Sequence, residues 1–134
     1  MLKLSKKWDY SLKAILFLAF RKWQLVKILD ISKELKISET FLRRIINNFE
    51  KSNLIKTVKW RNWWVIFERD LEKVSLYDVF VSVWEDLFIA SCTSWEKCNS
   101  LGDCDSVNVL NSLQKWFNSL LKIYTLDKIT KKNL

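Results

Sequence analysis

The sequence predicts a mainly α-helical chain with one small β-hairpin and a long C-terminal helix. Apolar residues recur at helical spacing twice in the first half, an alternating segment follows them, and a 3-4-3-4 apolar pattern occupies the end of the chain. With 134 residues, 49% of them hydrophobic, the chain can bury a core, which excludes disordered and collagen-like classes. We expect two regions, residues 1–74 and residues 75–134.

The first helix is predicted from about Lys6 to Arg21, because four apolar residues recur there at i, i+3, i+4 and i+7. They are Leu12, Ile15, Leu16 and Ala19. A short apolar segment, Leu25 to Ile28, precedes a second helix that we expect over Asp30 to Leu35.

A third helix is predicted from about Glu39 to Ser52, after a tight turn at Lys36-Ile37-Ser38. Ser38 is a plausible N-cap, since its hydroxyl can accept from the first free backbone N–H groups. The expected buried face repeats the i, i+3, i+4, i+7 spacing. It consists of Leu42, Ile45, Ile46 and Phe49.

The segment after the third helix alternates apolar and polar residues. Ile55 to Lys59 reads as a half-buried strand, and Trp64 to Glu68 can return antiparallel to it. Two short helices joined by a tight turn and followed by a two-stranded hairpin form the winged variant of the helix-turn-helix.

A long helix is predicted near the C-terminus, where apolar residues follow the spacing of a coiled-coil seam. The expected seam consists of Leu110, Leu113, Phe117, Leu120 and Tyr124.

The charge is unevenly distributed along the chain. Residues 1–62 carry fifteen basic and five acidic side chains, whereas residues 63–134 carry eight basic and ten acidic ones. A basic region of this kind favours a polyanion as partner. Arg and Asn on the third helix are residue types that read guanine and adenine in the major groove. A solvated polar helix face is the alternative, but the hairpin and the charge favour DNA.

The candidate DNA-contacting residues lie in two places. Those of the third helix are Ser38, Thr40, Arg43, Arg44 and Asn47. Those of the hairpin tip, which could reach phosphate or the minor groove, are Lys59, Arg61 and Asn62.

Three cysteines, Cys92, Cys98 and Cys104, have five residues between each pair and lie among polar neighbours. Cysteine is usually buried among apolar residues, so this pattern indicates metal binding more than three unrelated thiols. Thiolates suit zinc or an iron–sulfur cluster. The chain has no His, so a fourth ligand must be an oxygen donor or come from outside.

Several classes are excluded or disfavoured. The longest apolar run, Ala14 to Phe20, is too short to span a bilayer, so we expect no membrane partner. An odd number of cysteines argues against a secreted disulfide scaffold and favours a cytoplasmic protein. The absence of His, of a nucleophile–base pair and of a phosphate loop argues against an enzyme.

From Leu4 to Leu126 the sequence resembles the bacterial iron–sulfur cluster regulator and nitric-oxide-sensitive repressor (IscR/NsrR-type) family of winged-helix transcription factors. The resemblance is carried by Leu4-Ser5-Lys6-Lys7, by Ile37-Ser38-Glu39-Thr40-Phe41-Leu42-Arg43-Arg44-Ile45 and by the three cysteines. It implies a homodimer held by the long C-terminal helix, an inverted-repeat DNA site and a [2Fe-2S] or [4Fe-4S] cluster whose state controls DNA binding.

The resemblance implies two choices for the fourth cluster ligand. One branch of the family uses a His beyond the third Cys, where this chain has Asp105-Ser106-Val107. Another branch uses an Asp near the start of the partner's first helix, and Asp9 lies at that position. Glu96, Asp103 and Asp105 are the fallback ligands, and Asp9 could instead support the helix N-terminus electrostatically.

The tryptophan and glycine contents are abnormal. The chain has 8 Trp and 1 Gly, and the family's Gly-rich wing reads here Trp60-Arg61-Asn62-Trp63-Trp64. One hypothesis is that UGA codons, which some bacteria read as glycine, have been translated as Trp. The alternative is a truly Trp-rich protein with aromatic side chains at the wing.

The function best supported by the sequence is transcriptional regulation through a cluster that senses cluster status, nitric oxide or redox stress. The alternative is a winged-helix repressor with structural zinc or no metal. An electron-transfer protein is a third class, but that role does not need a basic helix-turn-helix.

Overall fold

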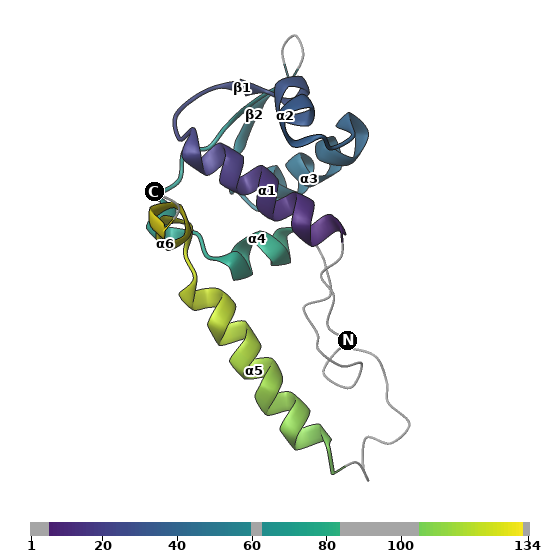
Figure 1. Ribbon diagram of the computed structural model, residues 1–134, viewed down its shortest axis with the longest axis vertical. Helices are drawn as coiled ribbons and strands as arrows, with labels where there is room; N and C mark the ends of the chain where they lie inside the picture. Colours follow the sequence, from purple (N-terminus) through teal and green to yellow (C-terminus); the bar gives the residue numbers. More distant parts are fainter. Residues whose placement is uncertain (1–5, 60–62, 84–104, 133–134) are drawn as a thin grey trace.

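The computed structural model describes residues 6–59, 63–83 and 105–132. Its central element is α1 (Lys6–Phe20), which packs against α2, α3, α4 and α6 (Figure 1). The buried face of α1 includes Ala14, Ile15 and Leu18, all fully covered. The predicted first helix is confirmed and ends one residue earlier than expected. Of its predicted apolar stripe, Ile15 and Ala19 are buried, whereas Leu12 and Leu16 are half-buried.

The helix-turn-helix consists of α2 (Ile28–Leu35) and α3 (Glu39–Lys51). Lys36 takes a left-handed conformation (φ 56°, ψ 40°) that ends α2, and its backbone N–H donates to the Ser32 carbonyl. The predicted buried face of α3 is confirmed, because each of its four residues is at most 1% exposed. These four are Leu42, Ile45, Ile46 and Phe49.

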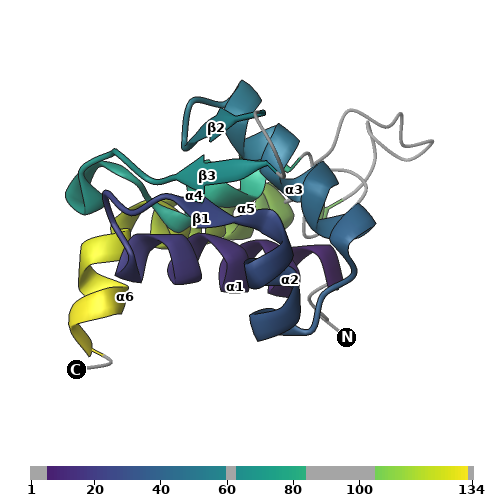
Figure 2. The same cartoon turned by 90° about the horizontal axis from the view of Figure 1, so that it is seen from above.

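The wing is a three-stranded antiparallel sheet of β1 (Val26–Lys27), β2 (Lys56–Val58) and β3 (Trp64–Ile66), in the order β1-β3-β2. Val65 is fully buried at its centre and pairs with Val26 on one side and Thr57 on the other. The sequence pattern predicts the β2–β3 hairpin, but it identifies the segment of β1 only as an apolar run and not as a strand. Figure 2 shows the sheet on one side of α1.

The C-terminal part adds η1 (Leu71–Lys73), α4 (Leu76–Ser82), α5 (Val107–Ile123) and α6 (Leu126–Lys132). The start of α4 is tied to the end of α5, because Leu76 N–H donates to the Tyr124 carbonyl and Leu126 N–H to the Val74 carbonyl, both at 2.9 Å. The sequence predicted α5 but not η1, α4 or α6.

Most of the apolar surface of α5 is exposed, and the helix extends away from the body formed by α1 and α4 (Figure 1). Its exposed stripe repeats at 4-3-4-3 spacing. The members are Val109, Leu113, Trp116, Leu120 and Ile123. The predicted seam is thereby divided: Leu113 and Leu120 lie in this stripe, while Phe117 packs against the core of its own chain.

Candidate nucleic-acid interface

The face of α3 opposite the core forms a shallow hollow of about 370 Å³. Its lining residues are Glu39, Thr40, Arg43, Arg44 and Asn47. Four of these five are predicted DNA-contacting residues, so the structure brings the predicted polar face together in one place. The hollow therefore presents two guanidinium groups, a hydroxyl and an amide on a single helix.

The N-terminus of α3 is fixed by two short polar contacts. Ser38 Oγ accepts from the Phe41 N–H at 3.3 Å, so the predicted N-cap is confirmed. In the preceding turn, Ser32 Oγ donates to the Ile37 carbonyl at 2.6 Å. The Phe41 ring also meets Tyr10 of α1 edge-on, with ring centroids 5.3 Å apart. These contacts hold α3 rigidly to the body, as a helix that presents side chains to a groove requires.

The two arginines of the hollow differ in their electrostatic surroundings. Arg43 Nη2 lies 2.6 Å from Glu39 Oε1, and its guanidinium is 5.3 Å from the Trp63 ring. Arg44 is exposed and forms no ion pair with any residue that the structure describes. A DNA phosphate or base can therefore reach Arg44 directly, whereas Arg43 must leave a carboxylate to bind DNA.

The wing contributes Lys59 next to the same hollow. Its ammonium lies 5.2 Å from the centre of the Trp63 ring, and the Arg43 guanidinium lies 5.3 Å from the centre of the same ring. Lys59 is exposed and follows β2 directly. The other two predicted wing contacts, Arg61 and Asn62, lie outside the described residues.

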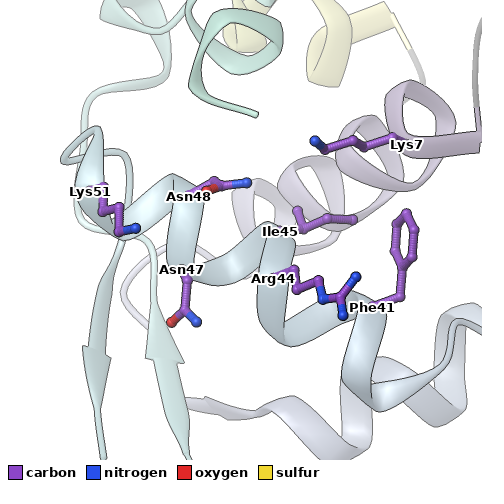
Figure 3. Close-up of a pocket in the computed structure, with 7 residues that line it drawn as sticks. All are labelled: Lys7, Phe41, Arg44, Ile45, Asn47, Asn48 and Lys51. Carbon is purple, nitrogen blue, oxygen red and sulfur yellow. The ribbon is translucent and has the colours of Figure 1, made fainter. Parts of the chain in front are cut away.

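A second hollow, of about 450 Å³, continues from the first around α3 to the start of α1 (Figure 3). Arg44 and Asn47 line both hollows. Lys7, Asn48 and Lys51 complete the polar lining and are not among the predicted DNA contacts. Arg44, Asn48 and Lys51 follow i, i+4, i+7 spacing, so a search for polar helical stripes could have found the part on α3.

Of the predicted cluster ligands, the structure describes Asp9 and the fallback Asp105. Asp9 lies in the first turn of α1 with its side chain about half exposed, and its carboxylate is 2.8 Å from Lys13 Nζ. Asp105 is exposed just before α5. Cys92, Cys98, Cys104, Glu96 and Asp103 lie outside the described residues, and no group of three metal-ligand side chains meets within the described ones.

A helix-turn-helix with a basic, solvent-facing second helix and an adjacent wing defines the class of winged-helix DNA-binding proteins. Within this class, the chain belongs to the Rrf2 family, whose model is described as an iron-dependent transcriptional regulator and matches residues 4–132. The protein is accordingly a DNA-binding transcriptional regulator and not an enzyme.

The chain is similar to several curated relatives over nearly its whole length. It is 29% identical to Protein aau3 of Rhizobium meliloti, over 97% of this chain and 86% of that protein. It is also 29% identical to the HTH-type transcriptional regulator NsrR of Bacillus licheniformis, over 96% of this chain and 92% of the relative.

Solved structures confirm the fold. T. potens IscR superposes with a TM-score of 0.74 at 20% identity, covering 99% of this chain and 89% of the other. CymR, the global cysteine regulator of B. subtilis, superposes with a TM-score of 0.75 at 16% identity, covering 98% of both chains. No helix in the described part of the chain is long and apolar enough to cross a membrane.

Proposed function

We propose that this regulator binds an inverted-repeat operator as a homodimer, and that an iron–sulfur cluster controls its affinity for DNA. The observation that carries the DNA-binding part is the hollow on α3, where Arg44 and Asn47 face solvent beside Thr40 and Arg43. Arg and Asn are the side chains best suited to guanine and adenine edges. Thr40 and Ser38 add hydroxyl groups that can reach phosphate.

The exposed stripe of α5 supports the homodimer. Five apolar side chains, each 48–79% exposed, follow a 4-3-4-3 pattern over about four turns. Such a stripe is the pattern that two helices bury against each other in a coiled coil. A second copy of α5 supplies the same stripe, and a two-fold pair then presents two α3 helices to the two halves of an inverted repeat.

The donor chemistry supports the cluster. The proposed ligands are Cys92, Cys98, Cys104 and the partner subunit's Asp9. An exposed i,i+4 ion pair such as Asp9–Lys13 contributes only about 0.3–0.5 kcal/mol. The carboxylate can therefore leave Lys13 at little cost and serve as a ligand. When bound, a cluster with one oxygen ligand supplies an iron that is open to exchange and hence sensitive to its chemical surroundings.

The decisive experiment is anaerobic purification with iron and sulfide counting, visible absorption spectra and DNA binding by the loaded and stripped protein. We expect bound iron and sulfide and a different DNA affinity after cluster removal. Protein that contains zinc or no metal and binds DNA equally well after chelation would instead establish the zinc-stabilised or clusterless repressor.

The ligand set is tested by single substitutions. Alanine at Cys92, Cys98 or Cys104 should abolish the cluster, whereas Asp9→Ala should leave one that is more labile or has altered spectra. Lys13→Ala is the matched control, because it removes the ion-pair partner of Asp9 and leaves the carboxylate. Wild-type spectra, stability and DNA response for Asp9→Ala would assign the fourth position to Glu96, Asp103 or Asp105.

Exposing the loaded protein separately to nitric oxide, to oxidant and to a chelator then identifies the signal. The operator sequence is determined by selecting the duplexes that the protein binds from a pool of random sequences. We expect the selected sites to be inverted repeats, and enrichment of single half-sites would contradict the dimeric arrangement.

A further inference from the structure

The second hollow, between α3 and the start of α1, gathers three cationic side chains. Lys7, Arg44 and Lys51 line it together with the amides of Asn47 and Asn48, and no carboxylate is among the described residues of its lining. Figure 3 shows these side chains around one space, with Lys7 reaching in from α1 and the others standing on α3. Three cations and two amide donors form a site for an oxyanion.

These cations are free to bind a ligand. Within the described ranges, Lys7, Arg44 and Lys51 form no ion pair, whereas Arg43, Lys13 and Lys56 are each within 2.8 Å of a carboxylate. A phosphate in the hollow therefore displaces water and counterions and does not compete with a neighbouring Glu or Asp.

The position of the hollow identifies the source of the phosphate. It shares Arg44 and Asn47 with the face of α3 that we assign to base contacts. A helix that lies in the major groove has a sugar–phosphate strand along each side, and one side of α3 is this hollow. We propose that the hollow holds a phosphodiester of the operator strand, with Lys7 and Lys51 as its principal ligands. The proposal rests on DNA binding by α3.

Phosphate contacts predict a particular signature in DNA binding. Neutralising one contact lowers the slope of log K against log salt by about 0.9 and weakens binding to all sequences alike. Lys7→Gln and Lys51→Gln should each do this, with a severalfold loss of affinity at low salt. Lys115→Gln on α5 is the matched control, because Lys115 is exposed and lines neither hollow.

The measurement is fluorescence anisotropy of the full chain on a selected duplex and on a random duplex over a range of salt concentrations. Wild-type slopes for both variants would overturn the proposal while DNA binding stands, and a wild-type chain that binds neither duplex would refute the proposed function itself. A loss confined to the selected duplex would assign Lys7 or Lys51 to bases. Inorganic phosphate at millimolar concentration should not compete, and competition by it would show an independent anion site.

A second, independent observation concerns the backbone at two tryptophans. Trp23 has φ 71° and Trp63 has φ 47°, in the left-handed region that a bulky side chain disfavours and glycine enters freely. Both conformations are held by backbone hydrogen bonds of 3.0 Å: Trp23 N–H donates to the Phe67 carbonyl, and Ile28 N–H donates to the Trp63 carbonyl. These hydrogen bonds fix the backbone beside the sheet, so both positions need a positive φ whatever side chain they carry.

Burial of the side chain does not compensate for the angle at Trp23, whereas the Trp63 ring packs against the core. The Trp23 ring is 62% exposed in its turn, and Trp116 is 79% exposed on α5. The chain contains 8 Trp and 1 Gly. Their sum matches the number of glycines expected in 134 residues when glycine makes up about 7% of a chain. We infer that the cell inserts glycine at the eight tryptophan positions. The stripe of α5 then retains Val109, Leu113, Leu120 and Ile123, and the ring contacts of Trp8 and Trp63 belong to the tryptophan-containing chain alone.

Two measurements test this inference. The eight codons should all be UGA, and peptides of the protein isolated from its own cells should have the masses of glycine-containing chains. A single UGG codon, or a tryptophan-containing native peptide, would overturn it. Independently, Trp23→Gly and Trp63→Gly should each raise Tm above the corresponding alanine variant, because alanine removes the ring but keeps the cost of positive φ. Equal Tm values for glycine and alanine would count against glycine at that turn.

Discussion

Helices α3 and α5 are both amphipathic, yet they use their apolar faces in opposite ways. In α3 the four apolar residues at the core are at most 1% exposed, and the polar face alone meets solvent. In α5 the buried residues are Gln114 and Leu121, while five apolar side chains are 48–79% exposed. Within residues 6–59, 63–83 and 105–132, the chain thus covers the apolar face of α3 and leaves the apolar stripe of α5 exposed.

This difference fits the proposed function, in which α3 contacts DNA and a second copy of the chain covers α5. The free surface of α3 is charged and polar, and its stability does not depend on being covered. The free surface of α5 is apolar, and an apolar stripe gains stability only when it leaves water. Substitutions on α3 and α5 should therefore change different quantities.

The largest expected effect comes from the core side of α3. Phe49→Ala removes a fully buried aromatic side chain and should lower the free energy of unfolding by about 3–5 kcal/mol in urea titrations. Leu113→Ala on α5 is the contrasting variant, and at low protein concentration it should leave unfolding almost unchanged. Equal losses for the two would show that α5 is as tightly packed within one chain as α3.

The solvent side of α3 comes next. Asn47→Ala should lower DNA affinity by about 1–3 kcal/mol and relax the preference at one base position if the amide contacts a base edge. The stability of the fold should be unaffected, since Asn47 is not part of the core. Anisotropy with a panel of duplexes tests this, and Asn111→Ala on α5 is the control. A uniform loss on every duplex would assign Asn47 to phosphate.

A smaller effect is expected on the exposed stripe of α5. Leu120 is 50% exposed, so covering it in a dimer should contribute about 1 kcal/mol per protomer. Leu120→Ala should therefore weaken the dimer in sedimentation equilibrium without changing the helix content. Ser119→Ala, at the neighbouring exposed position, should leave the dimer intact. Unchanged association of Leu120→Ala would exclude this stripe as the dimer contact.

The smallest effect concerns the start of α6. The hydroxyl of Thr125 donates to Asp127 and is the main reason that the pKa of Asp127 lies below 3.8. A lowered carboxyl pKa stabilises the fold above the unfolded-state value, and this contribution is lost as pH falls through the folded-state value. Thr125→Val should therefore lower stability at pH 7 and progressively less at pH values below 3.8, as measured by urea unfolding. Thr40→Val should show no such pH dependence.

The helices with long apolar patterns could be predicted from the sequence. The bounds of α1 and α3 and the buried set of α3 agree with the structure because each helix covers three or more turns with one consistent stripe. The α4 and α6 helices have seven residues each, which is too short for a periodic signal. The β1 strand has two residues, and its position depends on pairing with a strand almost forty residues later.

The candidate site was predictable in part for the same reason. The polar face of α3 follows from its own spacing, so Thr40, Arg43, Arg44 and Asn47 were found together. Lys7 could not be placed there, because only the packing of α1 against α3 brings it to the second hollow. On α5 the spacing of the apolar residues predicts a helix correctly. Phe117 packs against Trp8 of its own chain, whereas Leu113 is exposed. The spacing alone does not distinguish these two residues.

The ion pair between Glu39 and Arg43 makes DNA binding by Arg43 a partner exchange. An exposed pair of this spacing is worth about 0.3–0.5 kcal/mol, and Glu39 also repels any phosphate that comes near. A guanine edge offers two acceptors and about 1–3 kcal/mol of discrimination, which exceeds the free energy of the ion pair. On the proposed DNA contact, Arg43 can therefore exchange Glu39 for a base edge at little cost, and the exchange is favoured most where the sequence offers a guanine.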